Sequence, residues 1–174
     1  MPNRPLAIAV IGGSNADSQS EAWAYQVGRA LARRRCVVVC GGLTGVMEAV
    51  CRGAKEEGGI TVGILPGHDP NEANPYVDIA ICTGMGYARN PIVVKSGQAV
   101  IAIDGAYGTL SEIAHALGEG IPVVGLNTWT FSVNGQENNA VVRATDPEDA
   151  VAKAVALARQ GRRIPFPSTG GLPQ

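Results

Sequence analysis

Short continuous runs of apolar residues recur along the chain, and each run is closed by glycine, proline or polar residues. Runs of this length are typical of strands that are buried on both faces of a sheet. The pattern predicts six strands and a short seventh, over residues 6–11, 36–40, 60–65, 77–83, 99–104, 121–126 and 140–143.

Segments with helical spacing of apolar residues lie between these strands, over residues 18–35, 45–57, 88–96, 108–118 and 146–160. The sequence Ser18-Gln19-Ser20-Glu21 has the spacing of a capping box, which predicts the start of the first helix. Asp146 followed by Pro147 predicts the N-cap and first position of the last helix. Strands that alternate with helices imply right-handed crossovers between parallel strands. We therefore expect an α/β fold, a single doubly wound Rossmann-like domain over residues 1–161. Its mostly parallel sheet carries helices on both faces, and residues 162–174 form a flexible C-terminal tail.

Composition narrows the class of protein. The 174 residues suit one domain, and 45% hydrophobic against 17% charged residues is enough to build a core. Fourteen Lys and Arg against fifteen Asp and Glu give a formal net charge of −1, which disfavours a nucleic-acid partner. The four cysteines form no C-x-x-C pair, which favours reduced, buried thiols over a disulfide or a metal site. No signal-peptide pattern and no run of 18 apolar residues is found, so we expect a cytoplasmic protein without a membrane segment.

Three glycine-rich turns follow three of the predicted strands: Gly12-Gly13-Ser14, Gly41-Gly42-Leu43-Thr44-Gly45 and Gly105-Ala106-Tyr107-Gly108-Thr109. In a parallel sheet such turns meet at the carboxyl ends of the strands, where ligands bind beside a topological switch point. Glycine lets backbone N–H groups approach an anion, and a helix that begins there adds partial positive charge. Each turn alone is also explained as a tight strand-to-helix connection. The three together favour a shared phosphate site. The G-x-G-x-x-G and P-loop patterns are absent, which disfavours NAD and triphosphate hydrolysis.

Two interpretations are open for Glu112. The sequence Thr109-Leu110-Ser111-Glu112 has capping-box spacing, with Thr109 as the cap and Glu112 reaching back to it. Alternatively, the Glu112 carboxylate faces the sugar or base beyond a bound phosphate and stabilises an oxocarbenium-like transition state or moves a proton.

A cationic partner and an aromatic ring lie near the same turns in sequence. Arg89 follows the fourth predicted strand and offers a planar fork suited to phosphate, although a solvated surface arginine is the plainer interpretation. Tyr107 lies within the third glycine turn and is a candidate for stacking on a base or pterin ring.

Together the segments 39–48, 84–90 and 104–112 resemble the Lonely Guy (LOG) superfamily. In that family a P-G-G-x-G-T-x-x-E motif binds the phosphate of a nucleotide. The resemblance implies a Rossmann-like fold, phosphate contacts from Gly108 and Thr109, and catalytic roles for Glu112 and Arg89. The sequence has Asp104-Gly105-Ala106 where the family has Pro-Gly-Gly, and Asn90 where the hydrolases have lysine.

Two functions follow from the resemblance. The first is a phosphoribohydrolase that cleaves the N-glycosidic bond of a nucleoside 5′-monophosphate to give free base and ribose 5-phosphate, with no required cofactor and no metal. The alternative is a binding or carrier protein for a phosphorylated ligand such as the molybdenum cofactor, a pterin, or a nucleotide, because a short branch of the superfamily is similar to molybdenum cofactor carriers. The resemblance also implies a homodimer or higher homo-oligomer.

Overall fold

A computed structural model describes residues 4–161 of the chain. One sheet of seven parallel strands runs in the order β4-β3-β2-β1-β5-β6-β9. Its strands are β1 (Ala7–Gly12), β2 (Val37–Cys40), β3 (Thr61–Leu65), β4 (Ile79–Cys82), β5 (Ala99–Ile103), β6 (Val123–Leu126) and β9 (Val141–Arg143). The helices are α1 (Ser18–Arg33), α2 (Val46–Glu56), α3 (Asn90–Lys95), α4 (Tyr107–Gly118) and α5 (Pro147–Gln160), with 3₁₀ turns at Pro70–Glu72 and Gly86–Arg89.

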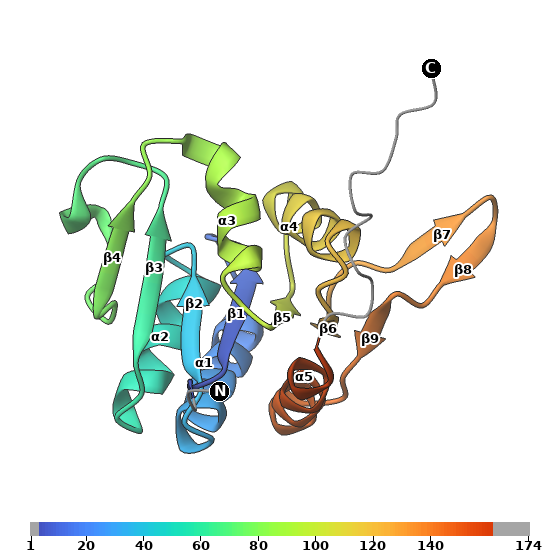
Figure 1. Cartoon of the computed structure of the whole chain (residues 1–174), viewed down its shortest axis with the longest axis horizontal. Helices are drawn as coiled ribbons and strands as arrows, with labels where there is room; N and C mark the ends of the chain where they lie inside the picture. Colours follow the sequence, from blue (N-terminus) through green and yellow to red (C-terminus); the bar gives the residue numbers. More distant parts are fainter. Residues whose placement is uncertain (1–3, 162–174) are drawn as a thin grey trace.

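Helices cover both faces of the sheet, as predicted (Figure 1). Helices α1, α2 and α5 pack on one face over one apolar cluster, and α3 and α4 pack on the other face over a second cluster. Strands β1 and β5 lie at the centre and are almost wholly buried, which is why they read as continuous apolar runs. The fold is therefore an α/β Rossmann-like fold.

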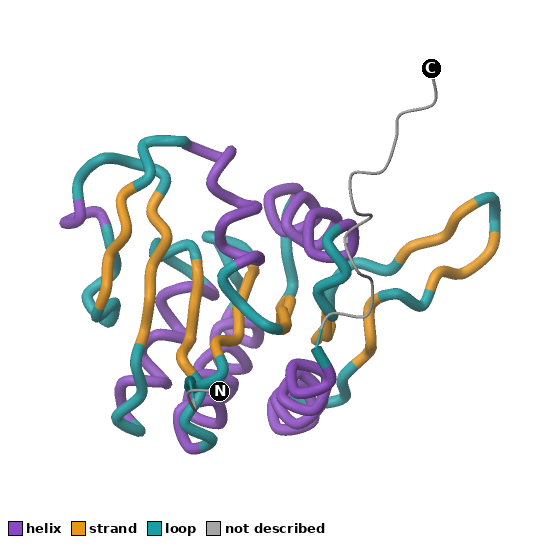
Figure 2. Tube along the Cα trace, in the orientation of Figure 1, coloured by secondary structure: helices purple, strands orange, loops and turns teal. Residues whose placement is uncertain are grey.

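The chain changes direction in the sheet between β1 and β5. From β1 it proceeds through β2 and β3 to β4, returns across the sheet to β5, and continues outward through β6 to β9. This is the topological switch point, where a crevice opens at the carboxyl ends of the strands in open α/β sheets. The loops that leave those ends lie along one edge of the sheet in Figure 2.

Helices α1 and α2 pack closely because a glycine of each helix faces the backbone of the other helix. A Cβ at Gly28 would lie 2.0 Å from the carbonyl oxygen of Val50, and one at Gly53 would lie 2.0 Å from that of Tyr25. Any larger side chain at either position would force the two helices apart.

A β-hairpin between β6 and β9 was absent from the predicted elements. Strands β7 (Phe131–Val133) and β8 (Gln136–Asn138) pair in antiparallel fashion and project beyond the β9 edge of the sheet (Figure 1). Asn134 and Gly135, the two turn residues, have φ of 53° and 77°, the left-handed pair that a tight hairpin turn requires.

Two further predictions were wrong in detail. The first helix is capped by Asp17, whose side chain accepts a hydrogen bond from the Ser20 N–H at 2.7 Å, so Ser18 lies inside the helix. Cys36, Cys40 and Cys51 are buried as predicted, but Cys82 is exposed because β4 is an edge strand.

The prediction of a tail over residues 162–174 falls outside the described residues. No helix within residues 4–161 combines the length and apolar character that a membrane span requires.

Candidate functional site

A crevice with a volume of about 190 Å³ opens at the switch point. It brings together loops that are distant in sequence: the turn after β1, the start of α2, the segment after β4 and the start of α4. Its lining residues are Gly12, Gly13, Ser14, Leu43, Met47, Tyr87, Arg89, Asn90, Ala106, Gly108, Thr109 and Glu112. Seven of the twelve residues singled out from the sequence line it directly.

Arg89 is buried in the wall of the crevice, with 7% of its surface exposed. Its Nε donates to the carbonyl oxygen of Ile64 at 2.8 Å, one Nη donates to that of Gly41 at 3.3 Å, and the other donates to Oδ1 of Asn90. These three acceptors leave two of the five guanidinium N–H donors for a ligand. The interpretation of Arg89 as a solvated surface residue is therefore wrong.

Among residues 4–161 the Arg89 charge has no hydrogen-bonded carboxylate partner, since the three acceptors that the structure describes are neutral oxygens. Desolvation lowers the pKa of Arg89, and the nearby Glu112 carboxylate opposes that change. A buried cation that is held by neutral groups favours the approach of an anion.

Glu112 lies on the inward face of α4, with Thr109 one turn before it and Ala116 one turn after it, all buried. Only 7% of its surface is exposed, and within residues 4–161 its carboxylate has no hydrogen-bond or ion-pair partner. Burial raises the pKa of Glu112 to about 7, while the Arg89 charge acts in the opposite direction. At neutral pH the carboxylate is therefore partly protonated and only partly cancels the Arg89 charge.

The capping-box interpretation of Thr109 and Glu112 is wrong. Helix α4 begins at Tyr107, and its N-cap residue is Ala106, which has no side chain able to cap it. The first helical hydrogen bond runs from the Leu110 N–H to the Ala106 carbonyl at 3.1 Å. The N–H groups of Tyr107, Gly108 and Thr109 thus have no helical acceptor, and Gly108 and Thr109 line the crevice. Free N–H groups at a helix start form an anion site.

The remaining glycines lie behind the lining and shape it. A Cβ at Gly41 would lie 2.6 Å from an Arg89 Nη, so the absence of a side chain there makes room for the guanidinium. Gly42 packs on Gly63 of β3, and Gly45, with φ of 65°, packs on the turn after β1. Gly105 has φ of 133° and a Cβ there would collide with Thr109. Gly41, Gly42, Gly45 and Gly105 therefore support the crevice without lining it.

Tyr107 is placed beside the crevice and is 80% exposed. Its ring centroid lies 6.0 Å from that of Trp129, with the two planes tilted by 36°. Tyr107 is therefore free on one side to contact a ligand. Sequence reasoning did not single out Trp129.

Five other lining residues were also missed, namely Leu43, Met47, Tyr87, Asn90 and Ala106. A signal was available for each in the sequence. Leu43 and Met47 follow Gly41-Gly42, Tyr87 and Asn90 lie within two residues of Arg89, and Ala106 lies inside the third glycine-rich turn. No group of three or more His, Cys, Asp or Glu within the described chain is arranged to hold a metal ion.

The fold is a Rossmann-like α/β domain, and its crevice at the switch point is lined by the buried Arg89 and by the start of α4. Comparison with known proteins assigns the chain to a specific family. The chain belongs to the SLOG cluster4 family, whose sequence model matches residues 5–151. A protein of unassigned function from Archaeoglobus fulgidus is 47% identical over 121 residues, which are 70% of this chain and 80% of that protein.

Solved structures give a similar result. The molybdenum cofactor binding protein of Rippkaea orientalis is 37% identical, with a TM-score of 0.81 over 89% of this chain and 98% of that one. The molybdenum cofactor carrier protein of Chlamydomonas reinhardtii is 33% identical, with a TM-score of 0.77 over 90% and 99%. DNA processing protein A of Streptococcus pneumoniae is 19% identical with a TM-score of 0.66 over 86% and 62%, which is a likeness of fold alone.

Proposed function

We propose that this protein binds the molybdenum cofactor, a phosphate-bearing pterin, in the crevice at the switch point and carries it without chemical change. Two similar structures belong to proteins named for binding or carrying this cofactor, at 37% and 33% identity over nearly the whole chain. In this proposal the crevice holds the phosphate, and the pterin lies toward Tyr107.

The observation that carries the proposal is the set of unpaired donors around one space. Gly108, Thr109 and Arg89 all line the crevice, and among the described residues the N–H groups of Gly108 and Thr109 and two N–H donors of Arg89 have no hydrogen-bond acceptor. Charge-assisted hydrogen bonds of this kind are short and strong, and a phosphate has enough oxygens to accept from all of them. The Glu112 carboxylate would repel a phosphate when ionised, but its pKa of about 7 lets it accept a proton as the anion binds.

A second candidate, hydrolysis of a nucleoside 5′-monophosphate, is favoured by Glu112 alone. A carboxyl group with a pKa near 7 suits general acid or base catalysis at neutral pH. Against it, Glu112 is the single carboxylate among the described residues that line the crevice, whereas glycoside hydrolysis commonly uses a pair of carboxylates. The carrier function needs only the donors.

The test uses the full chain and the cofactor released anaerobically from a molybdenum enzyme. Protein and cofactor are mixed and separated by gel filtration, and the retained pterin is measured by fluorescence after oxidation. We expect the wild-type protein to retain cofactor, and Gly108→Asp to lose it. A Cβ at Gly108 meets nothing within 4 Å, and an aspartate in the first turn stabilises a helix while occupying the anion site.

Arg159→Gln is the matched control, because Arg159 is an exposed residue in the last turn of α5 and does not line the crevice. Failure of the wild-type protein to retain cofactor would overturn the carrier function. Release of free base from a nucleoside monophosphate panel, lost in Glu112→Gln, would establish the hydrolase instead.

Oligomeric state, localisation and domain organisation belong to the same proposal. We propose that the molecule acts as a homo-oligomer in the cytoplasm, with residues 1–161 as one domain. Sedimentation at two protein concentrations tests the oligomer, and a monomer at both would contradict it.

A further inference from the structure

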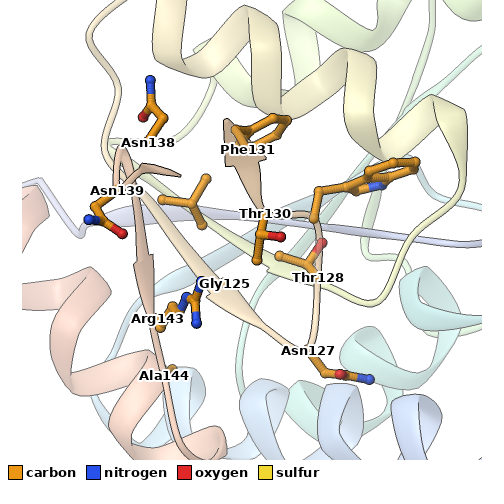
Figure 3. Close-up of a pocket in the computed structure, with 11 residues that line it drawn as sticks. Gly125, Asn127, Thr128, Thr130, Phe131, Asn138, Asn139, Arg143 and Ala144 are labelled. Carbon is orange, nitrogen blue, oxygen red and sulfur yellow. The ribbon is translucent and has the colours of Figure 1, made fainter. Parts of the chain in front are cut away.

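A second pocket, here called the hairpin pocket, lies between the loop that follows β6, the β7–β8 hairpin and strand β9. It has a volume of about 210 Å³ and is separate in its lining from the crevice. Figure 3 shows the side chains of Thr130, Phe131 and Arg143 beside the space between β9 and the loop after β6. Because the loop leaves the carboxyl end of β6, the hairpin pocket opens at the same edge of the sheet as the crevice.

The chemistry of the hairpin pocket suits a flat heterocycle that is close to neutral. Asn139 and Thr130 offer groups that both donate and accept hydrogen bonds, and Phe131 and Trp129 offer apolar ring surface. Arg143 is the only charged side chain in the lining among the described residues, and it is already paired with Glu137 at 2.8 Å. A second phosphate would find no free cation there, whereas a ring with amide-like edges would find matching partners.

Trp129 adds a donor that lacks a partner. Its Nε1 is buried, and no acceptor lies within hydrogen-bond distance among the described residues. A buried donor without an acceptor destabilises the free protein.

The hairpin pocket and the crevice are joined by direct contacts. The exposed Tyr107 ring, at the start of α4, contacts the Trp129 ring, which lines the hairpin pocket. The Thr128 hydroxyl donates to the carbonyl oxygen of Asp104 at 2.5 Å and ties the loop after β6 to the loop that leads into α4. These two contacts therefore connect the loop that lines the hairpin pocket to the start of α4, whose residues Gly108 and Thr109 line the crevice.

We propose that the hairpin pocket is the recognition subsite for the heterocyclic ring of the ligand whose phosphate occupies the crevice. The inference rests on the proposed function, since it assigns the ring end of that same ligand. The phosphate end supplies affinity for any phosphorylated compound, and the hairpin pocket selects a ring with donors and acceptors along its edge. Tyr107 and Trp129 cover the path between the two.

The test separates the two ends of the ligand. Retention of the molybdenum cofactor is measured for the wild-type protein, for Trp129→Leu and for the double variant Thr130→Val with Asn139→Ala. The double variant changes only exposed side chains, so it remains informative if Trp129→Leu folds poorly. Ser132→Ala is the matched control, because Ser132 is an exposed hairpin residue outside the lining. Displacement of the bound cofactor by glycerol phosphate, which has no ring, reports the crevice alone.

We expect Trp129→Leu to bind the cofactor about tenfold more weakly or worse, the loss typical of one ring contact. The double variant should lose about tenfold as well, because two hydrogen-bonding side chains are removed. The affinity of both variants for glycerol phosphate, and the cofactor affinity of Ser132→Ala, should stay unchanged. Equal cofactor affinity in the wild type and the hairpin variants would overturn the subsite and leave the carrier function intact. An equal loss of glycerol phosphate binding would also overturn it, because the pocket would then not act on the ring alone. If the wild-type protein retains no cofactor, the proposed function fails and the subsite fails with it.

Discussion

The buried carboxylate of Glu112 should make the free protein less stable as the pH rises. It has no hydrogen-bonded partner within the described chain, and its pKa is raised from 4.5 to about 7. The folded protein therefore holds a proton that the unfolded chain releases between those two pH values. Stability that depends on this proton is fully present below pH 4.5 and is lost as the pH rises through about 7.

Glu112→Gln removes the charge and keeps the shape, so it should stabilise the protein, and more strongly at high pH. Each pKa unit corresponds to about 1.4 kcal/mol. Linkage with the two pKa values gives an advantage of about 1 kcal/mol at pH 5 and about 3 kcal/mol at pH 8. For a domain of this size the growth between the two pH values corresponds to roughly 5–10 °C in Tm.

Urea unfolding followed by circular dichroism at pH 5 and pH 8, on protein freed of ligand, measures both free energies by linear extrapolation. Glu21→Gln removes an exposed carboxylate of α1 and should change the free energy of unfolding by less than about 0.5 kcal/mol at either pH. If Glu112→Gln gives the same difference at pH 5 and pH 8, or destabilises the protein at both, the account of a strained carboxylate facing Arg89 is refuted.

Three further predictions test other parts of the structure. A lysine at position 89 cannot bond the three acceptors of the guanidinium, so Arg89→Lys should lower the free energy of unfolding, measured in urea, by about 2 kcal/mol. It should also weaken phosphate binding measured by calorimetry. If either value is unchanged, the hydrogen bonds of Arg89 do not have the role described above. Gly28→Ala should destabilise the protein by about 2 kcal/mol or more, because its Cβ would lie 2.0 Å from the Val50 carbonyl oxygen. Gly118→Ala is the control, since a Cβ there meets open space at the end of α4, and it should be neutral or slightly stabilising in the same urea titration. One thiol, that of Cys82, should react rapidly with a thiol reagent in the native protein, and the other three only after unfolding; more than one fast-reacting thiol would show that the core opens.

The sheet was predictable because its central strands are buried on both faces and so appear as uninterrupted apolar runs. The hairpin was not predicted because β8 is fully exposed and carries only polar residues, which gives no apolar pattern. Its one clear signal was Asn134-Gly135, a dipeptide typical of tight hairpin turns.

Helix starts were predictable only where the cap itself was identified, as at Asp146. Both capping-box interpretations were wrong for the same reason, since the N-cap residues, Asp17 and Ala106, lie earlier in the chain than the boxes imply. The spacing of Ser or Thr and Glu occurs inside helices as well as at their starts. At Glu112 the interior position is what directs the carboxylate inward.

The candidate site could be placed on one edge of the sheet from sequence, but the burial of Arg89 could not. Its two backbone acceptors, in Ile64 and Gly41, lie 25 and 48 residues away in the sequence. Contacts of that separation exist only once the sheet has assembled, so no local pattern signals them.

The anchoring of Arg89 to the ends of β2 and β3 has a thermodynamic consequence. A free arginine side chain gives up about 2 kcal/mol of rotamer entropy when it is fixed. Here that loss is incurred during folding, so an incoming anion meets a cation that is already immobile. The same rigidity means that Arg89 cannot swing aside to let the anion go. If the proposed carrier function holds, the affinity for the anion is gained without a moving part, and the rate of unloading should be set by the ligand rather than by a motion of Arg89.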